Sequence, residues 1–104
     1  LEADPALSAR EDFPLICDVC RHHHERWDGR GYPDGLTGFR IAPWVQVVGL
    51  ADAFDALIHS RAYKPAYLWT QAASMISGGA CGAFSPDILL CFRFHIGDIY
   101  AAVY

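Results

Sequence analysis

Three consecutive histidines, His22, His23 and His24, are the residues of this 104-residue chain best suited to bind a metal ion. Apolar residues at helical spacing precede them and predict a helix over residues 13–26: Phe13, Ile16, Cys17 and Cys20. Since each residue turns a helix by about 100°, His23 and His24 are expected to face inward with this stripe, and His22 to face solvent. Neutral imidazole is a common metal ligand, so His23 and His24 are candidate ligands. The alternative is that both are simply hydrogen-bonded at the end of the helix.

Two aspartates, Asp52 and Asp55, form the second candidate group. Their spacing places both on one face of a predicted helix that is otherwise rich in Val, Leu, Ala and Phe. A buried carboxylate needs a partner, so Asp52 is expected to bind either a metal ion or an arginine. For Asp55 by itself, a cap or a salt bridge to Arg30 or Arg61 is the favoured interpretation. The alternative is that Asp55 orients a ligand histidine through a hydrogen bond.

The elements that must position these side chains are all predicted to be helical. No segment shows the apolar–polar alternation of a strand, so the fold class is all-α. Residues 27–38 contain four glycines and a proline and are expected to form a long irregular loop. The helix that starts at Pro43 has apolar residues nearly all around it, so it is expected to be buried at the centre. Helices are predicted over residues 13–26, 43–60 and 68–76 and from Ser85–Pro86 onward, with a turn at 61–67.

The composition restricts the class of protein. The chain is 53% hydrophobic and carries a net charge of −4, which suits one compact domain and offers no basic surface for duplex nucleic acid. No apolar run reaches the roughly 18 residues of a membrane span, and no signal peptide pattern is present. A cytoplasmic location is therefore expected.

The four cysteines, Cys17, Cys20, Cys81 and Cys91, are expected to be small buried apolar residues in a reducing environment. Cys17 and Cys20 have the spacing of a zinc-binding pair, with histidines close by. Because Cys81 and Cys91 form no second pair of this kind, the indication for zinc is weak.

Several segments together resemble the signature of the HD-GYP domain. These are HHE at 23–25, DGRGYP at 28–33, GLTG at 35–38, LADAFDAL at 50–57, RAYK at 61–64 and FSP at 84–86. The resemblance covers roughly residues 16–92. It implies a helical bundle of the HD phosphodiesterase type that holds two or three metal ions, usually iron or manganese. It also implies hydrolysis of the bacterial second messenger cyclic di-GMP, to the linear dinucleotide or to GMP.

Carried over to matching positions, the resemblance implies roles for individual residues. The implied metal ligands are His23, His24 and Asp52. The implied substrate contacts are Tyr32, in the loop that lines the substrate site, and Arg61 and Lys64, which would bind the nucleotide.

The family's His-Asp pair, which lies upstream of these motifs, has no counterpart here, because no histidine precedes His22. We therefore expect residues 13–94 to be the C-terminal half of an HD-GYP domain, a truncated bundle. Residues 1–12 would be a connector, and residues 95–104 a tail of unassigned role. These 104 residues alone are expected to be inactive and to self-associate through exposed apolar faces.

Two other functions stay open at this point. One is a non-catalytic regulatory module whose GYP loop docks a signalling protein. The other is a structural domain that binds zinc through Cys and His residues. The sequence leaves open the metal, the reaction product and the oligomeric state.

Overall fold

The computed structural model describes residues 11–59 and 65–103 of the chain. Arg61 and Lys64 lie outside the described residues. The described part contains four α-helices, one short 3-10 helix and no strand, which confirms the all-α class. The elements are α2 (Phe13–His22), η1 (Gly38–Arg40), α3 (Pro43–Ile58), α4 (Trp69–Ser77) and α5 (Pro86–Val103).

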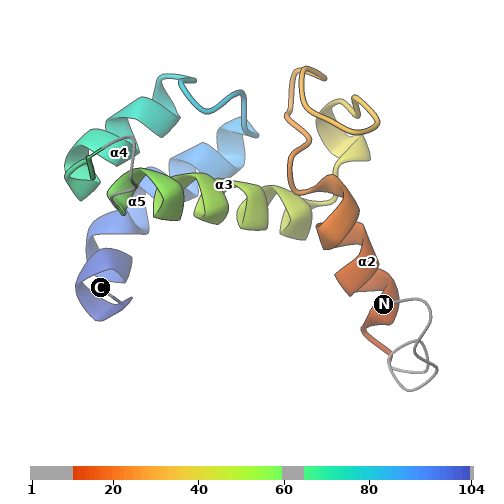
Figure 1. The fold of residues 1–104 in the computed structure, drawn as a ribbon, viewed down its shortest axis with the longest axis horizontal. Helices are drawn as coiled ribbons and strands as arrows, with labels where there is room; N and C mark the ends of the chain where they lie inside the picture. The colour runs from red at the N-terminus through yellow and green to blue at the C-terminus, as the bar shows by residue number, and fades with distance from the viewer. Residues whose placement is uncertain (1–10, 60–64, 104) are drawn as a thin grey trace.

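Helix α3 is the central element of the molecule. It contacts α2 and α4, and α4 in turn contacts α5. Figure 1 shows α3 running across the middle, with α2 and the loop that follows it at one end and α4 and α5 at the other. The molecule therefore has two structurally different parts, one at each end of α3.

A hydrophobic core fills the end formed by α3, α4 and α5. Ala72 and Ile76 of α4 are completely buried, and the rings of Phe54 and Phe92 pack edge to face with centroids 5.7 Å apart. Such burial is the main source of stability in a small domain. The buried cluster consists of Leu50, Phe54, Leu57, Ala72, Ile76, Phe84, Phe92 and Ile96.

Local sequence signals set most of the helix boundaries. Proline occupies the first turn of α2 and the first position of α3 and α5, where its missing N–H costs nothing. Gly78 caps the end of α4, close to the end predicted at residue 76. The last helix begins at Pro86, also as expected, and continues without a break through residues 95–103.

The first helix ends earlier than the sequence predicted, at His22 instead of about residue 26. The backbone N–H of Glu25 bonds to the carbonyl of His22, and the N–H of Tyr32 bonds to the carbonyl of His24. The chain thus turns away from the helix axis because the following loop supplies partners to residues 24 and 25. Apolar periodicity gives no sign of such a turn.

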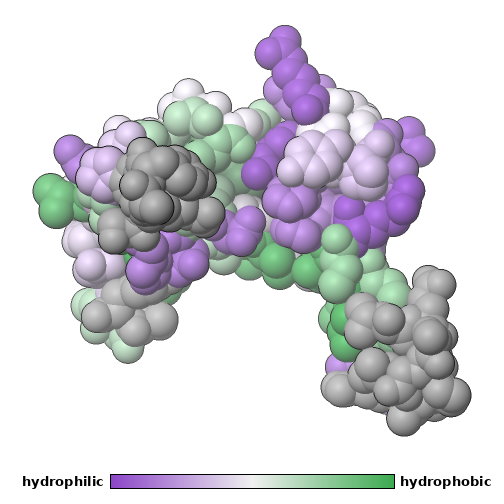
Figure 2. Space-filling view, viewed as in Figure 1, coloured by the Kyte–Doolittle hydropathy of each residue, from purple (hydrophilic) through white to green (hydrophobic). Residues whose placement is uncertain are grey.

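The expectation that α3 is buried on nearly all sides is wrong. Trp44 and Val47 are about half exposed, and Asp52 and Asp55 are also exposed. The helix buries only the face that meets α2, α4 and α5. Figure 2 shows apolar surface along the course of α3 and hydrophilic surface over the loop after α2. No helix of the described part is long and apolar enough to cross a membrane.

Candidate metal centre

The three residues predicted to bind metal come together in the structure. His23 and His24, just past the end of α2, and Asp52, in α3, each offer a ligand atom, and these atoms lie within 4.8 Å of one another. The two imidazole rings are 4.1 Å apart between centroids and inclined by 41°. Two imidazoles and one carboxylate are donors that suit borderline-to-hard metals such as iron and manganese. The donor set therefore fits the implied metal.

A glycine in α3 allows this close approach. Gly49 lies one turn before Asp52 and is buried. A Cβ atom at this position would lie only 2.6 Å from the carbonyl oxygen of His23, which is closer than real side chains come. The end of α2 thus rests directly on the backbone of α3. In the sequence, the only indication of this role is that Gly49 is a glycine inside a predicted helix.

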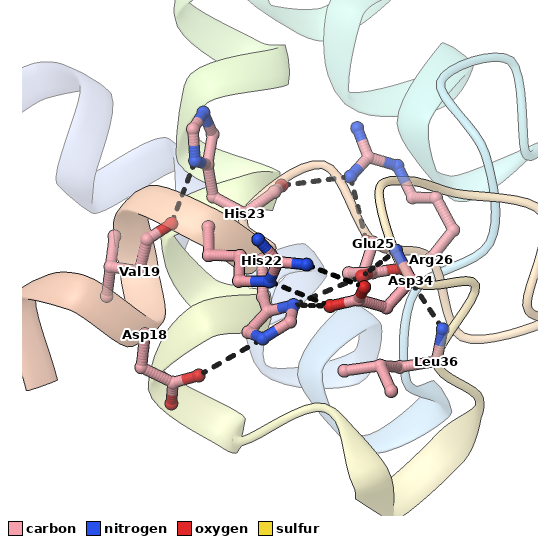
Figure 3. Close-up of polar contacts among 9 residues, drawn as sticks. Asp18, Val19, His22, His23, Glu25, Arg26, Asp34 and Leu36 are labelled. Atoms are coloured by element: carbon pink, nitrogen blue, oxygen red, sulfur yellow. Dashed lines mark hydrogen bonds and ion pairs between the residues drawn. The ribbon is translucent and has the colours of Figure 1, made fainter. Parts of the chain in front are cut away.

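The orientation of His23 is fixed by a hydrogen bond to its own helix. Its Nδ1 lies 2.8 Å from the carbonyl oxygen of Val19, as Figure 3 shows. A carbonyl only accepts, so Nδ1 carries the proton, and in the neutral ring Nε2 keeps its lone pair. Protein metal sites often orient ligand histidines in this way.

The tyrosine of the GYP motif covers the second imidazole. The ring of Tyr32 stacks on His24, with centroids 4.9 Å apart and planes inclined by 15°. Tyr32 is nevertheless 61% exposed. The residue expected to line the substrate site therefore lies beside a candidate metal ligand and is open to solvent.

A buried carboxylate, Glu25, holds the loop in place. Its Oε2 accepts a hydrogen bond from the backbone N–H of Asp34 (2.9 Å), and its Oε1 accepts one from that of Leu36 (3.0 Å). Burial by itself raises the pKa of Glu25, but the bonds from Asp34, His22 and Leu36 outweigh it, so the pKa is lowered overall. The sequence prediction gave Glu25 no role. A glutamate directly before a glycine-rich loop with many backbone N–H groups was the available signal.

His22 does not face solvent, contrary to the prediction. Its side chain is only 17% exposed, its Nδ1 lies 3.1 Å from Oε2 of Glu25, and its Nε2 lies 3.9 Å from Oδ1 of Asp18 (Figure 3). The predicted angle was measured from Cys20, which is itself exposed, and the loop folds back and covers the side of α2 that carries His22. A rotation angle says nothing about what packs against a face.

His22, Glu25 and Asp34 form a second group of ligand atoms within 4.8 Å. These atoms already have partners, because Glu25 accepts the backbone bonds and Arg21 donates to Asp34 through Nε at 3.0 Å and Nη2 at 2.8 Å. The group is therefore explained as a structural network, in which Arg21 lowers the pKa of Asp34 mainly through its hydrogen bond.

Asp55 is exposed, whereas the sequence analysis expected it to be buried. Its Oδ1 lies 3.3 Å from Nδ1 of His59, one turn later in sequence. The suggested role of Asp55 in orienting a ligand histidine stays a prediction.

All four cysteines are free thiols, and none is fully buried as expected: Cys17 and Cys81 are half-buried, and Cys20 and Cys91 are exposed. Among residues 11–59 and 65–103, no candidate group of three metal ligands includes a cysteine.

Comparison with known proteins identifies the family. A family model described as an HD domain matches residues 5–88. The chain belongs to the HD domain family and is of the HD-GYP type.

Curated relatives of the chain include cyclic dinucleotide phosphodiesterases. A cyclic di-GMP phosphodiesterase of Vibrio cholerae is 40% identical over 86% of this chain and 18% of its own length. The cyclic di-GMP phosphodiesterase response regulator RpfG of Xanthomonas campestris is 49% identical over 78% of this chain and 22% of its own length. The 3'3'-cGAMP-specific phosphodiesterase 2 of Vibrio cholerae is 43% identical over 90% of this chain and 18% of its own length. The chain thus spans about a fifth of the length of these relatives.

Proposed function

We propose that this chain forms part of a metal-dependent phosphodiesterase that hydrolyses cyclic di-GMP. The observation that carries the proposal is the convergence of His23, His24 and Asp52 from two separate elements. The relatives described above, which include two cyclic di-GMP phosphodiesterases, support this choice of substrate class. Iron or manganese is the proposed metal, as the resemblance to the HD-GYP domain implies, and two imidazoles and a carboxylate are compatible with either.

The chemistry needs such a centre. A phosphodiester anion repels nucleophiles, and its hydrolysis requires a reduction of the barrier on the order of 20 kcal/mol. Bound divalent ions supply a hydroxide at neutral pH and neutralise charge on the phosphoryl oxygens. The protein's own part is to hold the side chains of His23, His24 and Asp52 with their ligand atoms within 4.8 Å of one another.

Contacts with the nucleotide are proposed for three residues. Tyr32 is exposed and stacked beside His24, so its ring borders the space next to the proposed metal. Arg61 and Lys64 follow α3 in sequence, and charge-assisted hydrogen bonds to phosphate are strong. Replacing both with Ala in the complete natural polypeptide is expected to raise the KM for cyclic di-GMP. An unchanged KM would refute this assignment.

The proposal as a whole is tested with the complete natural polypeptide and either manganese or ferrous iron. Cyclic di-GMP and 3'3'-cGAMP are supplied separately, and linear products are quantified by chromatography. Hydrolysis is expected, and a His23→Ala, His24→Ala double variant is expected to lose both turnover and Mn²⁺ binding. Asp52→Asn is expected to lose most of both.

Matched controls are available on α5. His95 and Asp98 are exposed there, so His95→Ala and Asp98→Asn should leave turnover and metal binding unchanged. A wild-type protein that neither binds Mn²⁺ nor hydrolyses either dinucleotide would refute the proposal.

The 104 residues on their own are proposed to be inactive. Three protein ligands can hold one ion, but they cannot fix the geometry of a two-metal site that both activates water and clamps phosphate. Exposed apolar residues on α3 and α5, such as Val47 and Phe94, favour self-association. Turnover that rises with the concentration of this segment and requires His23 and His24 would contradict this view.

A further inference from the structure

The guanidinium group of Arg26 lies between the end of α2 and the segment that precedes α5. Its Nε donates to the carbonyl of Cys81 at 2.8 Å. Its Nη1 donates to the carbonyls of His23 at 3.1 Å and Glu25 at 3.0 Å. Because the guanidinium donors are held in a rigid planar fork, these bonds fix residues 23–25 relative to residue 81.

Phe84 and Gly82, in the segment before α5, contact the side chain of Arg26. The guanidinium carbon lies 4.8 Å from the centroid of the Phe84 ring, and Phe84 is itself buried in the core. Gly82 has a φ of +97°, and a Cβ atom there would lie 2.8 Å from Cγ and Cδ of Arg26. The neighbouring Trp27 N–H donates to the carbonyl of Ala83 at 2.9 Å. Arg26 thus links the loop to the hydrophobic core.

The carbonyl oxygen of His23 is the point where this link meets the metal centre. It accepts the bond from Arg26, and it also rests against Gly49 of α3. Asp52 follows one turn later on the same helix. The backbone of His23 is therefore held at a fixed place relative to Asp52 by two independent contacts.

We propose that Arg26 is a positioning residue for the metal centre, which it serves by fixing the His23 backbone against α3. The inference rests on the proposed function, because it assumes that His23 binds the metal. Arg26 touches neither the metal ligand atoms nor the substrate in this role. It acts through the two carbonyls at the end of α2 and through the anchor at Cys81 and Phe84.

The inference distinguishes the shape of arginine from its charge. A lysine keeps the positive charge but has a single ammonium group, which cannot bond to Cys81 and His23 in the same planar geometry. If only charge mattered, Arg26→Lys would behave as wild type. If the fork matters, it should behave more like Arg26→Met.

The test measures Mn²⁺ binding to the complete natural polypeptide by isothermal titration calorimetry, without substrate. Arg26→Met is expected to raise the Kd by about tenfold or more, the range seen when outer supports of metal ligands are removed. Arg26→Lys should recover little of that loss. The matched control is Arg93→Met, at an exposed arginine of α5, which should leave the Kd unchanged. Far-UV circular dichroism checks that each variant keeps its helices.

A second variant displaces the arginine without removing it. Gly82→Ala places a methyl group against the Arg26 side chain and should also weaken Mn²⁺ binding. If both changes act through the position of Arg26, the double variant should bind no more weakly than the worse single variant. Effects that multiply instead would overturn the inference, as would folded Arg26→Met and Arg26→Lys proteins that bind like wild type. A wild-type protein that fails to bind Mn²⁺ overturns the proposed function and this inference together.

Discussion

The two ends of α3 are stabilised in different ways. At the end with α4 and α5, apolar side chains from three helices pack into one cluster. At the end with α2 and the loop, Glu25 is the only buried residue within residues 11–40. Directional hydrogen bonds to Glu25 and from Arg26 hold the loop there, beside the buried apolar side chains of Ile41 and Val45 at the start of α3. The candidate metal ligands lie at this second end.

This difference has a physical consequence. Hydrophobic burial is non-directional and insensitive to pH, whereas hydrogen bonds to an ionised group depend on geometry and on protonation. The core end should therefore carry the global stability of the fold. The loop end should respond to single polar substitutions and to acid while the helices stay folded.

The largest effect is expected from Phe54→Ala at the core end. Phe54 is 4% exposed and packs on Phe92, so truncation should lower the free energy of unfolding by about 3–5 kcal/mol. Urea denaturation followed by circular dichroism measures this loss. Phe94→Ala, at a ring that is 75% exposed, is the control and should change stability by less than about 0.5 kcal/mol. If both variants lost a similar amount of unfolding free energy, the assignment of Phe54 to the core and of Phe94 to the surface would be wrong.

An intermediate and local effect is expected from Glu25→Ala. The N–H groups of Asp34 and Leu36 lose their acceptor, and because both bonds are only partly buried the cost should lie at or below the roughly 1–3 kcal/mol of a fully buried donor. Amide hydrogen exchange at these two residues should become roughly tenfold faster or more, while exchange at Ile76 in the core stays the same. Glu11→Ala, at an exposed glutamate, is the control. Uniform acceleration across both ends would contradict the proposed independence of the loop.

Acid should produce the same contrast without mutation. The folded-state pKa values of Glu25 and Asp34 are lowered, so their stabilising contribution is complete above the ordinary carboxyl values of 4.5 and 3.8. It is lost as the pH falls from those values through the lowered ones. On acidification, the NMR indole signal of Trp27, in the loop, should therefore shift at a higher pH than that of Trp69, which stacks on Tyr100 at the core end. Simultaneous shifts would show a single cooperative unit.

The smallest effect is expected from Arg21→Ala. Arg21 pairs with Asp34 at the surface, where ion pairs are weak and screened by salt. Exchange at the Asp34 amide should accelerate less than in Glu25→Ala, and the difference from wild type should shrink in high salt. Arg40→Ala, at another exposed arginine, serves as the control. If exchange at the Asp34 amide accelerated as much as in Glu25→Ala, the surface ion pair would contribute more to the stability of the loop than its exposure predicts.

The sequence by itself determined the helical class and the positions of most helix starts. Proline at the first turns of three helices and glycine after α4 act locally, so neighbouring residues suffice to predict them. His23, His24 and Asp52 were also recognisable as a group, because helical rotation and the family motif indicate the same residues. Both kinds of signal depend on spacing along the chain.

Only the tertiary structure decided how this site is built. His22 lies against Glu25 because the loop folds over α2, and His23 meets α3 because Gly49 has no side chain. Arg26 reaches Cys81, 55 residues further along the chain. Contacts of this kind depend on which surfaces meet in three dimensions, and helical periodicity carries no information about that.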